Sequence, residues 1–110
     1  MDISNMGDLL RNAGKVRKQI DRVQEDLKER VVEGSAGGGL VTALVNGQQD
    51  VLKVNIKPEA VSPDPEEVEL LEDMILAAIA QAVEKSRELK SEEINKVTGG
   101  FGEGLSGLFF

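Results

Sequence analysis

A short, glycine-punctuated block at residues 30–57 lies between two long charged segments, and this arrangement restricts the fold more than any other feature of the chain. The block reads RVVEGSAGGGLVTALVNGQQDVLKVNIK and is rich in residues that favour strands. The segments on either side carry apolar residues at helical spacing. This order predicts a helix, a small meander and a second helix, so we expect the function to reside on the helices.

Length and composition narrow the class of protein. A chain of 110 residues fits one domain with a modest core, which gains from burying more surface against a partner. Its 13 basic and 20 acidic residues give a net charge of −7, so any nucleic-acid contact requires a local basic patch. The absence of Cys and His excludes disulfides, thiol chemistry, imidazole bases and the usual zinc ligands.

No segment has the apolar length of a signal peptide or a membrane span. We therefore expect a soluble cytoplasmic protein with no membrane partner.

The first helix is expected over residues 5–29. Its apolar residues are spaced three and four apart, as in a heptad seam, which favours packing against another helix. The seam comprises Met6, Leu9, Ala13, Val16, Ile20, Val23 and Leu27. At 1.5 Å per residue this helix is about 36 Å long.

Glycines and a hairpin signal divide the central block into three strands. A first strand at residues 31–32 leads into a glycine loop, residues 40–45 form the second, and Asn46-Gly47 predicts a hairpin because both residues tolerate positive φ. In the third strand, residues 51–57, apolar Leu52, Val54 and Ile56 alternate with polar residues. This alternation predicts one buried and one solvated face.

The second helix is expected from Asp64 to about residue 97. Asp64 can cap it, Pro65 suits its first position, and Glu67 sits where a capping box needs an acid. The acids that follow complement the helix dipole. Both helices are longer than a small antiparallel sheet, so their apolar ends overhang, and a two-fold homodimer would bury them.

The chain resembles the YbaB/EbfC nucleoid-associated proteins of bacteria over nearly its whole length. The resemblance rests on Val32-x-Gly34-x-x-Gly37-x-Gly39-Leu40-Val41, Val45-Asn46-Gly47, Val54-x-Ile56-x-Pro58 and Leu70-Leu71-Glu72-Asp73-Met74-Ile75-x-Ala77-Ala78. It implies an α+β fold of order α-β-β-β-α at residues 1–98, with a three-stranded antiparallel sheet, two long helices and a flexible glycine-rich tail at 99–110. It also implies a tweezer-like homodimer that binds duplex DNA with little sequence preference, in nucleoid organisation or gene regulation.

The outer face of the first helix is the expected DNA contact. Arg11, Lys15, Lys18 and Arg22 lie four, three and four residues apart, on one stripe opposite the seam, and Arg17 flanks them. Such a row can follow phosphates along a groove. The alternative is a solvated face with ion pairs such as Arg22 to Glu25, and the resemblance favours DNA.

A second, shorter basic cluster lies in the second helix. Lys85, Arg87 and Lys90 are interleaved with Glu84 and Glu88. We interpret this cluster chiefly as solubilising, and as a secondary candidate for DNA contact.

Other functions find less support. The chain lacks Trp and Tyr, which disfavours single-strand binding by stacking, and has no helix-turn-helix or zinc finger. No Gly-Lys-Ser/Thr follows the glycine run, so we expect no nucleotide site, cofactor, metal or catalytic residue. The apolar tail end could pack back, stay disordered or dock a protein partner. The competing hypothesis is an acidic dimeric adaptor that does not bind DNA.

Overall fold

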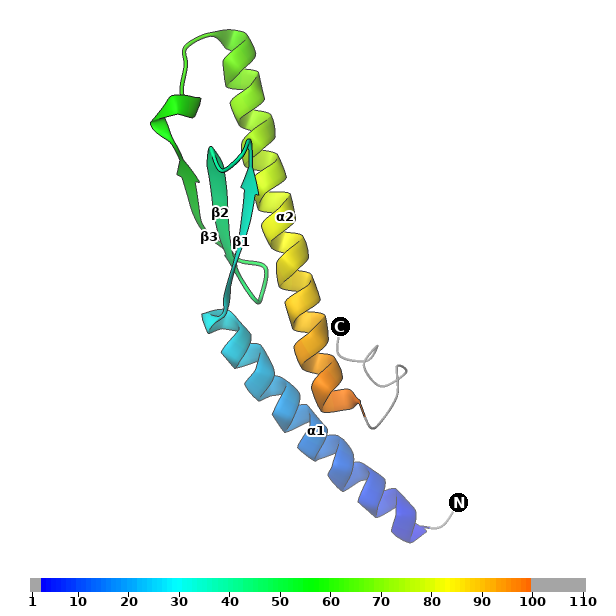
Figure 1. The fold of residues 1–110 in the computed structure, drawn as a ribbon. Helices are drawn as coiled ribbons and strands as arrows, with labels where there is room; N and C mark the ends of the chain where they lie inside the picture. The colour runs from blue at the N-terminus through cyan, green and yellow to red at the C-terminus, as the bar shows by residue number, and fades with distance from the viewer. Residues whose placement is uncertain (1–2, 100–110) are drawn as a thin grey trace.

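The computed structural model describes residues 3–99, with side chains from Leu10 onward (Figure 1). Along the chain it has α1 (Ile3–Glu29), β1 (Val31–Ala36), β2 (Val41–Asn46), β3 (Val51–Ile56), the 3₁₀ turn η1 (Pro58–Ala60) and α2 (Pro65–Thr98). The predicted α+β class and the α-β-β-β-α order are therefore confirmed. The predicted tail and any partner contact it makes lie outside the described residues, apart from Gly99.

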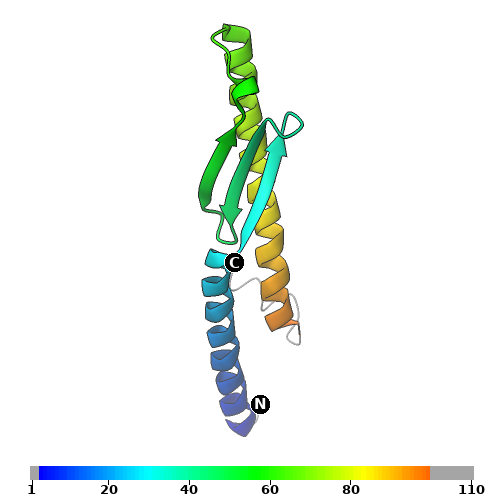
Figure 2. The same ribbon diagram turned by 60° about the vertical axis from the view of Figure 1, so that its left-hand side comes forward.

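The three strands form one antiparallel sheet in the order β1-β2-β3, with β2 in the centre. The middle of α2 runs along one face of this sheet, and the first turns of α2 extend beyond it (Figure 2). At the other end, α1 continues past the end of α2 (Figures 1 and 2). The molecule is consequently elongated, with extents of 72 × 21 × 17 Å.

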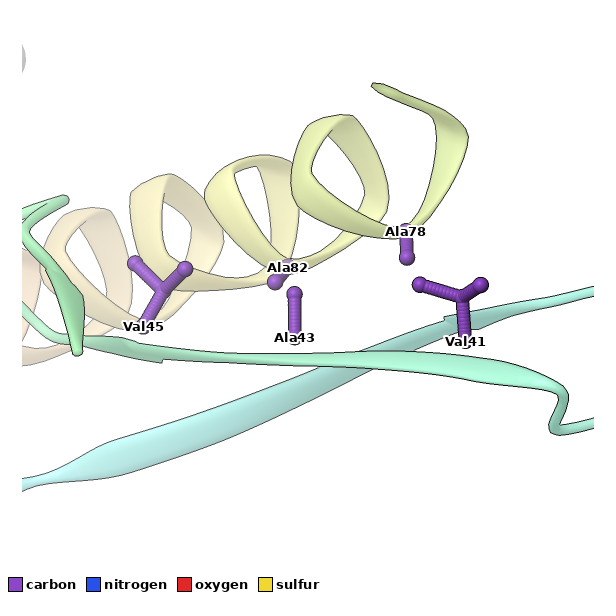
Figure 3. Packing of buried hydrophobic residues seen from close by; sticks show 5 residues of the cluster. All are labelled: Val41, Ala43, Val45, Ala78 and Ala82. Carbon is purple, nitrogen blue, oxygen red and sulfur yellow. The ribbon is translucent and has the colours of Figure 1, made fainter. Parts of the chain in front are cut away.

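The core lies between β2 and the middle of α2. Val41, Ala43 and Val45 project from β2 toward Ala78 and Ala82 of α2, and all five side chains are fully buried (Figure 3). Because three of the five are alanines, the helix comes close to the strands. Half-buried residues of β1, β3 and α2 surround this centre.

The β3 strand departs from the predicted alternation. A β-bulge shifts the register so that Val51, rather than Leu52, pairs with Val45. Val51, Leu52 and Ile56 remain 47%, 53% and 39% exposed. Val54, the middle residue of the predicted face, is half-buried and packs against the core. The predicted face is therefore only partly buried in the single chain, because α2 covers β1 and β2 and barely reaches this edge strand.

The β2–β3 hairpin is confirmed, although its geometry differs from the prediction. The residue with positive φ is Gln49, at 64°, rather than Asn46 or Gly47. The amide of Asn46 donates to the Asp50 carbonyl at 3.0 Å and that of Gln49 to the Asn46 carbonyl at 3.1 Å. A three-residue loop that ends in a left-handed residue is the common alternative to a two-residue turn.

The start of α2 is also largely as predicted. The carboxylate of Asp64 accepts a hydrogen bond from the Glu66 amide at 3.0 Å, which confirms the cap, and Pro65 is the first helical residue. The predicted capping box does not form. The Asp64 amide donates instead to the hydroxyl of Ser62, at 3.2 Å, which takes the place that the Glu67 carboxylate would have in a capping box.

The seam of α1 is partly buried within the chain itself. Val16, Ile20 and Leu27 are buried, Val23 is half-buried and Ala13 is exposed. The side chains of Met6 and Leu9 lie outside the described part. Since α1 contacts α2 and β2, the seam packs on its own chain from residue 16 onward. Only the part of α1 before this point overhangs as the sequence predicted.

Candidate nucleic-acid interface

The basic row on α1 is exposed to solvent. Arg11, Lys15, Lys18 and Arg22 are all exposed, while the seam residues Val16 and Ile20 between them are buried. At about 100° of rotation per residue, the four basic positions fall within roughly 60° of one another. The apolar stripe of α1 therefore faces the rest of the protein, and the basic stripe faces solvent.

Few internal partners compete for these cations. Within the described side chains, no ion pair involves Lys15, Lys18 or Arg22. The predicted pair of Arg22 with Glu25 does not form, because Glu25 pairs with Lys28 at 3.2 Å. The charges of Lys15, Lys18 and Arg22 thus remain available to a polyanion.

Arg17 does not belong to the row. It is exposed, but the helical rotation places it roughly 130° from the centre of the other four. A ligand that follows the row along one side of α1 would not meet the Arg17 guanidinium at the same time. Arg17 therefore points to a different side of α1 from the row, and its contact with DNA stays a prediction.

The residues of the second basic cluster, Lys85, Arg87 and Lys90, lie in two different surroundings. The Lys85 ammonium donates to the Glu33 carbonyl at 2.8 Å, and the neighbouring Ser35 amide donates to the Gln81 side chain at 2.8 Å. These contacts cover the outer edge of β1, so Lys85 is engaged in the fold. Arg87 and Lys90 instead line an open hollow of about 310 Å³ with Gln49 and Ser91, and Arg87 lies 3.9 Å from Glu84.

Opposite charges are separated along the molecule. Residues 11–22 contain five basic residues and one acid, whereas residues 57–84 contain eight acids and one lysine. The first group lies on α1 and the second begins after β3 and runs through the first half of α2, at the other end (Figure 1). A net charge of −7 therefore coexists with a locally basic arm.

Two further observations concern other kinds of site. Across the described helices, none has a stretch long and apolar enough to cross a bilayer. Nor do the described residues bring three or more acidic side chains together in a way that could hold a metal ion.

Two long helices around a three-stranded sheet, with an exposed row of cations on one of them, define a class of small α+β proteins. The sequence model of the YbaB/EbfC DNA-binding family matches residues 1–101. The chain belongs to this family.

Similar proteins agree with this assignment. A nucleoid-associated protein of Acetivibrio thermocellus is 49% identical over 105 residues, covering 96% of this chain and 90% of that protein. One from Clostridium perfringens is 46% identical over 107 residues, covering 97% and 92%. The crystal structure of an uncharacterised Helicobacter pylori protein superposes with a TM-score of 0.68 at 22% identity, covering 93% and 99%, and supports the fold.

Sequence reasoning missed the residues that attach α1 to the rest of the molecule. The Asn46-Gly47 pair indicated a turn, but no local pattern shows that this turn contacts both helices. Gln48 and Ser86, which make these contacts, stand in otherwise ordinary polar surroundings in the sequence. Only a long-range view could have identified them.

Proposed function

We propose that this protein is a nucleoid-associated protein that binds duplex DNA as a homodimer, through phosphate contacts and with little sequence preference. Through this binding it would affect DNA conformation, nucleoid organisation or gene expression in the bacterial cytoplasm. The observation that carries the proposal is the exposed row of Arg11, Lys15, Lys18 and Arg22 on α1. Membership of a DNA-binding family and relatives named as nucleoid-associated proteins support it.

The separation of charge makes DNA binding compatible with an acidic chain. Charges in solution are screened over about 8 Å at physiological salt. The acids of residues 57–84 lie toward the other end of a molecule 72 Å long, so they weaken the attraction of the α1 row only slightly. DNA would approach the α1 arm with the acidic end directed away from it.

Phosphate contacts account for the expected lack of sequence preference. Arginine and lysine side chains at four-residue and three-residue intervals can bind backbone oxygens along one groove edge, and these contacts carry no direct base information. Two copies of the arm in a dimer would double the contacts and hold both sides of a duplex.

The proposed dimer would bury the apolar side chains that one chain leaves exposed. Val51, Leu52 and Ile56 form such a surface on β3. The opposite edge strand, β1, is already covered by Gln81 and Lys85 of α2. We therefore place the second copy on the β3 side. A molar mass of two chains by light scattering, reduced to one chain by Leu52→Glu, would support this placement; an unchanged dimer would overturn it.

Binding to a labelled duplex of about 30 base pairs, measured across a salt series, tests the proposed function. Affinity should fall steeply with salt because released counterions supply much of the binding free energy. Duplexes of different sequence should bind with similar affinity. A dimer that does not bind duplex even at low salt would overturn the proposal and favour the adaptor hypothesis.

A further inference from the structure

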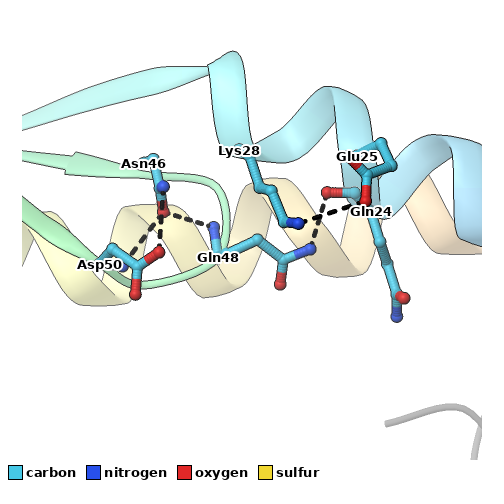
Figure 4. A network of polar contacts seen from close by, with 6 residues as sticks. All are labelled: Gln24, Glu25, Lys28, Asn46, Gln48 and Asp50. Carbon is cyan, nitrogen blue, oxygen red and sulfur yellow. Dashed lines mark hydrogen bonds and ion pairs between the residues drawn. The ribbon is translucent and has the colours of Figure 1, made fainter.

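The turn between β2 and β3, residues 46–50, is attached to the end of α1. The Gly47 amide donates to the carbonyls of Leu27 at 2.8 Å and Arg30 at 2.9 Å, and the Gln48 side chain donates to the Gln24 carbonyl at 2.8 Å (Figure 4). The last carbonyls of a helix lack partners within the helix. The Leu27 carbonyl also accepts from the Arg30 amide at 3.2 Å, so the turn adds a partner from across the chain to this local cap of α1.

The same turn is attached to α2 through one buried hydroxyl. Ser86 Oγ donates to the Asn46 carbonyl at 2.6 Å and accepts from the Gln49 amide at 3.2 Å and the Gln49 side-chain nitrogen at 2.9 Å. A serine hydroxyl has one donor and two acceptor sites, so all its capacity is used. Ser86 is fully buried, which keeps water from competing.

Internal hydrogen bonds stiffen the turn between these two attachments. The Asn46 side-chain oxygen accepts from the amides of Gln48 at 2.9 Å and Asp50 at 3.1 Å, and its nitrogen donates to the Asp50 carboxylate at 3.2 Å (Figure 4). Asn46 is itself buried. A turn held in this way transmits the position of α2 to α1 instead of absorbing it.

We infer that this turn is the joint that sets the direction of α1 relative to α2, and that Gln48 and Ser86 are positioning residues for the basic row. The inference rests on the proposed function. Apolar burial of Val16 and Ile20 holds α1 near α2 but is non-directional, whereas hydrogen bonds fix direction.

The distance along α1 from the turn to the basic row determines how strongly a change at the turn affects DNA binding. Arg11 lies 13 residues before Gln24, about 20 Å along the helix. A tilt of about 10° at the joint would move Arg11 by roughly 3 Å, enough to break a charge-assisted hydrogen bond of ordinary length. The joint can thus change DNA affinity without any change in charge.

Gln48→Ala tests the inference, with Gln81→Ala as the matched control. Each variant loses one 2.8 Å hydrogen bond between a glutamine side chain and a backbone group, but Gln81 binds β1 and does not contact α1. The chain has no cysteine, so spin labels can be placed at Asn12→Cys and Glu88→Cys, on α1 and α2. Mixing with excess unlabelled protein leaves one labelled copy per dimer.

The two readouts are the distance between the spin labels, measured by double electron–electron resonance, and the affinity for duplex DNA. We expect Gln48→Ala to shift or broaden the distance between the labels and to weaken DNA binding about tenfold, roughly the loss of one charge-assisted contact. Gln81→Ala should change neither. Ser86→Ala, checked for folding by circular dichroism, should broaden the distance as Gln48→Ala does.

An unchanged distance distribution in Gln48→Ala would contradict the inference that the turn sets the direction of α1 relative to α2. Equal DNA affinity in Gln48→Ala and Gln81→Ala would overturn its positioning role. If the unsubstituted dimer does not bind duplex, the proposed function fails and the positioning role fails with it. The distance between the labels still tests whether the turn sets the direction of α1.

Discussion

Gly34 of β1 lies so close to Ala82 of α2 that a Cβ atom on Gly34 would come within 2.6 Å of the Ala82 backbone nitrogen. The backbone of the strand therefore packs directly on the backbone of the helix. With alanines at positions 43, 78 and 82 in the buried cluster, this contact brings α2 down onto the sheet.

Substitution Gly34→Ala should destabilise the fold by about 1–3 kcal/mol, because the new methyl group would meet backbone atoms that cannot rotate away. Urea denaturation followed by circular dichroism at a fixed protein concentration measures the change. Gly14→Ala is the control: nothing lies within 4 Å of that position, and alanine in an exposed helix should stabilise by roughly 0.5–1 kcal/mol. Equal stability of the two variants would contradict the close contact.

The double substitution Lys15→Gln/Lys18→Gln should flatten the salt dependence of DNA binding. Each lost phosphate contact reduces the slope of log affinity against log salt by about 0.9, so four lost contacts per dimer give roughly 3 to 4. Lys53→Gln/Lys57→Gln removes the same charge from exposed positions on and after β3, and light scattering checks that this control is still a dimer, because β3 lies in the proposed dimer contact. If both pairs change the slope equally, net charge rather than the α1 row governs binding.

Substitution Asn46→Asp should destabilise the turn at neutral pH by about 1–3 kcal/mol, because a carboxylate oxygen would replace the nitrogen that donates to Asp50 at 3.2 Å. The two like charges would also repel each other across the turn at this pH.

A reciprocal variant checks this reasoning. Asn46→Asp combined with Asp50→Asn exchanges donor and acceptor and should recover much of the lost stability at pH 7. Chemical denaturation of both single variants and the double variant gives the coupling free energy. Strictly additive effects would show that the Asn46–Asp50 contact contributes nothing.

Glu93 should stabilise the attachment of α1 in a pH-dependent way. The hydrogen bond from Lys96, with the charges of Lys96 and Arg30, lowers the pKa of Glu93 below its ordinary value of 4.5. A carboxyl whose pKa is depressed on folding contributes stability above its unfolded pKa, and this contribution is lost as the pH falls through the folded value.

Thermal unfolding of Glu93→Gln should therefore show a lower Tm than the unsubstituted chain at pH 7 and the same Tm in strong acid. Glu92→Gln is the control, since Glu92 is exposed and takes part in none of the ion pairs among the described residues. A deficit of Glu93→Gln that persists unchanged in acid would exclude the ion pairs as its cause.

Local signals predicted most of the secondary structure. Asp64 and Pro65 start α2 where a capping residue and a ring without an amide hydrogen favour a helix start. The α1 seam predicted which side of the helix is buried, and the opposite position of Arg11, Lys15, Lys18 and Arg22 follows from the same periodicity. These inferences succeed because they need only the geometry of one helix.

Non-local geometry explains the errors. Simple alternation in β3 could not show the bulge, since register depends on how β2 pairs with it. The engagement of Lys85 with the Glu33 carbonyl joins residues 52 apart in the chain, so the basic cluster of α2 could not be divided correctly from its sequence.

The sequence by itself determined the order of the elements, the family and a basic arm in an acidic chain, because periodicity, turn residues and charge are properties of neighbouring positions. Only the tertiary structure decided where that arm points. Its direction depends on Gln48 and Ser86, whose hydrogen bonds reach 24 residues back to Gln24 and 40 residues back to Asn46. Directional contacts between distant residues exist only once the chain has folded.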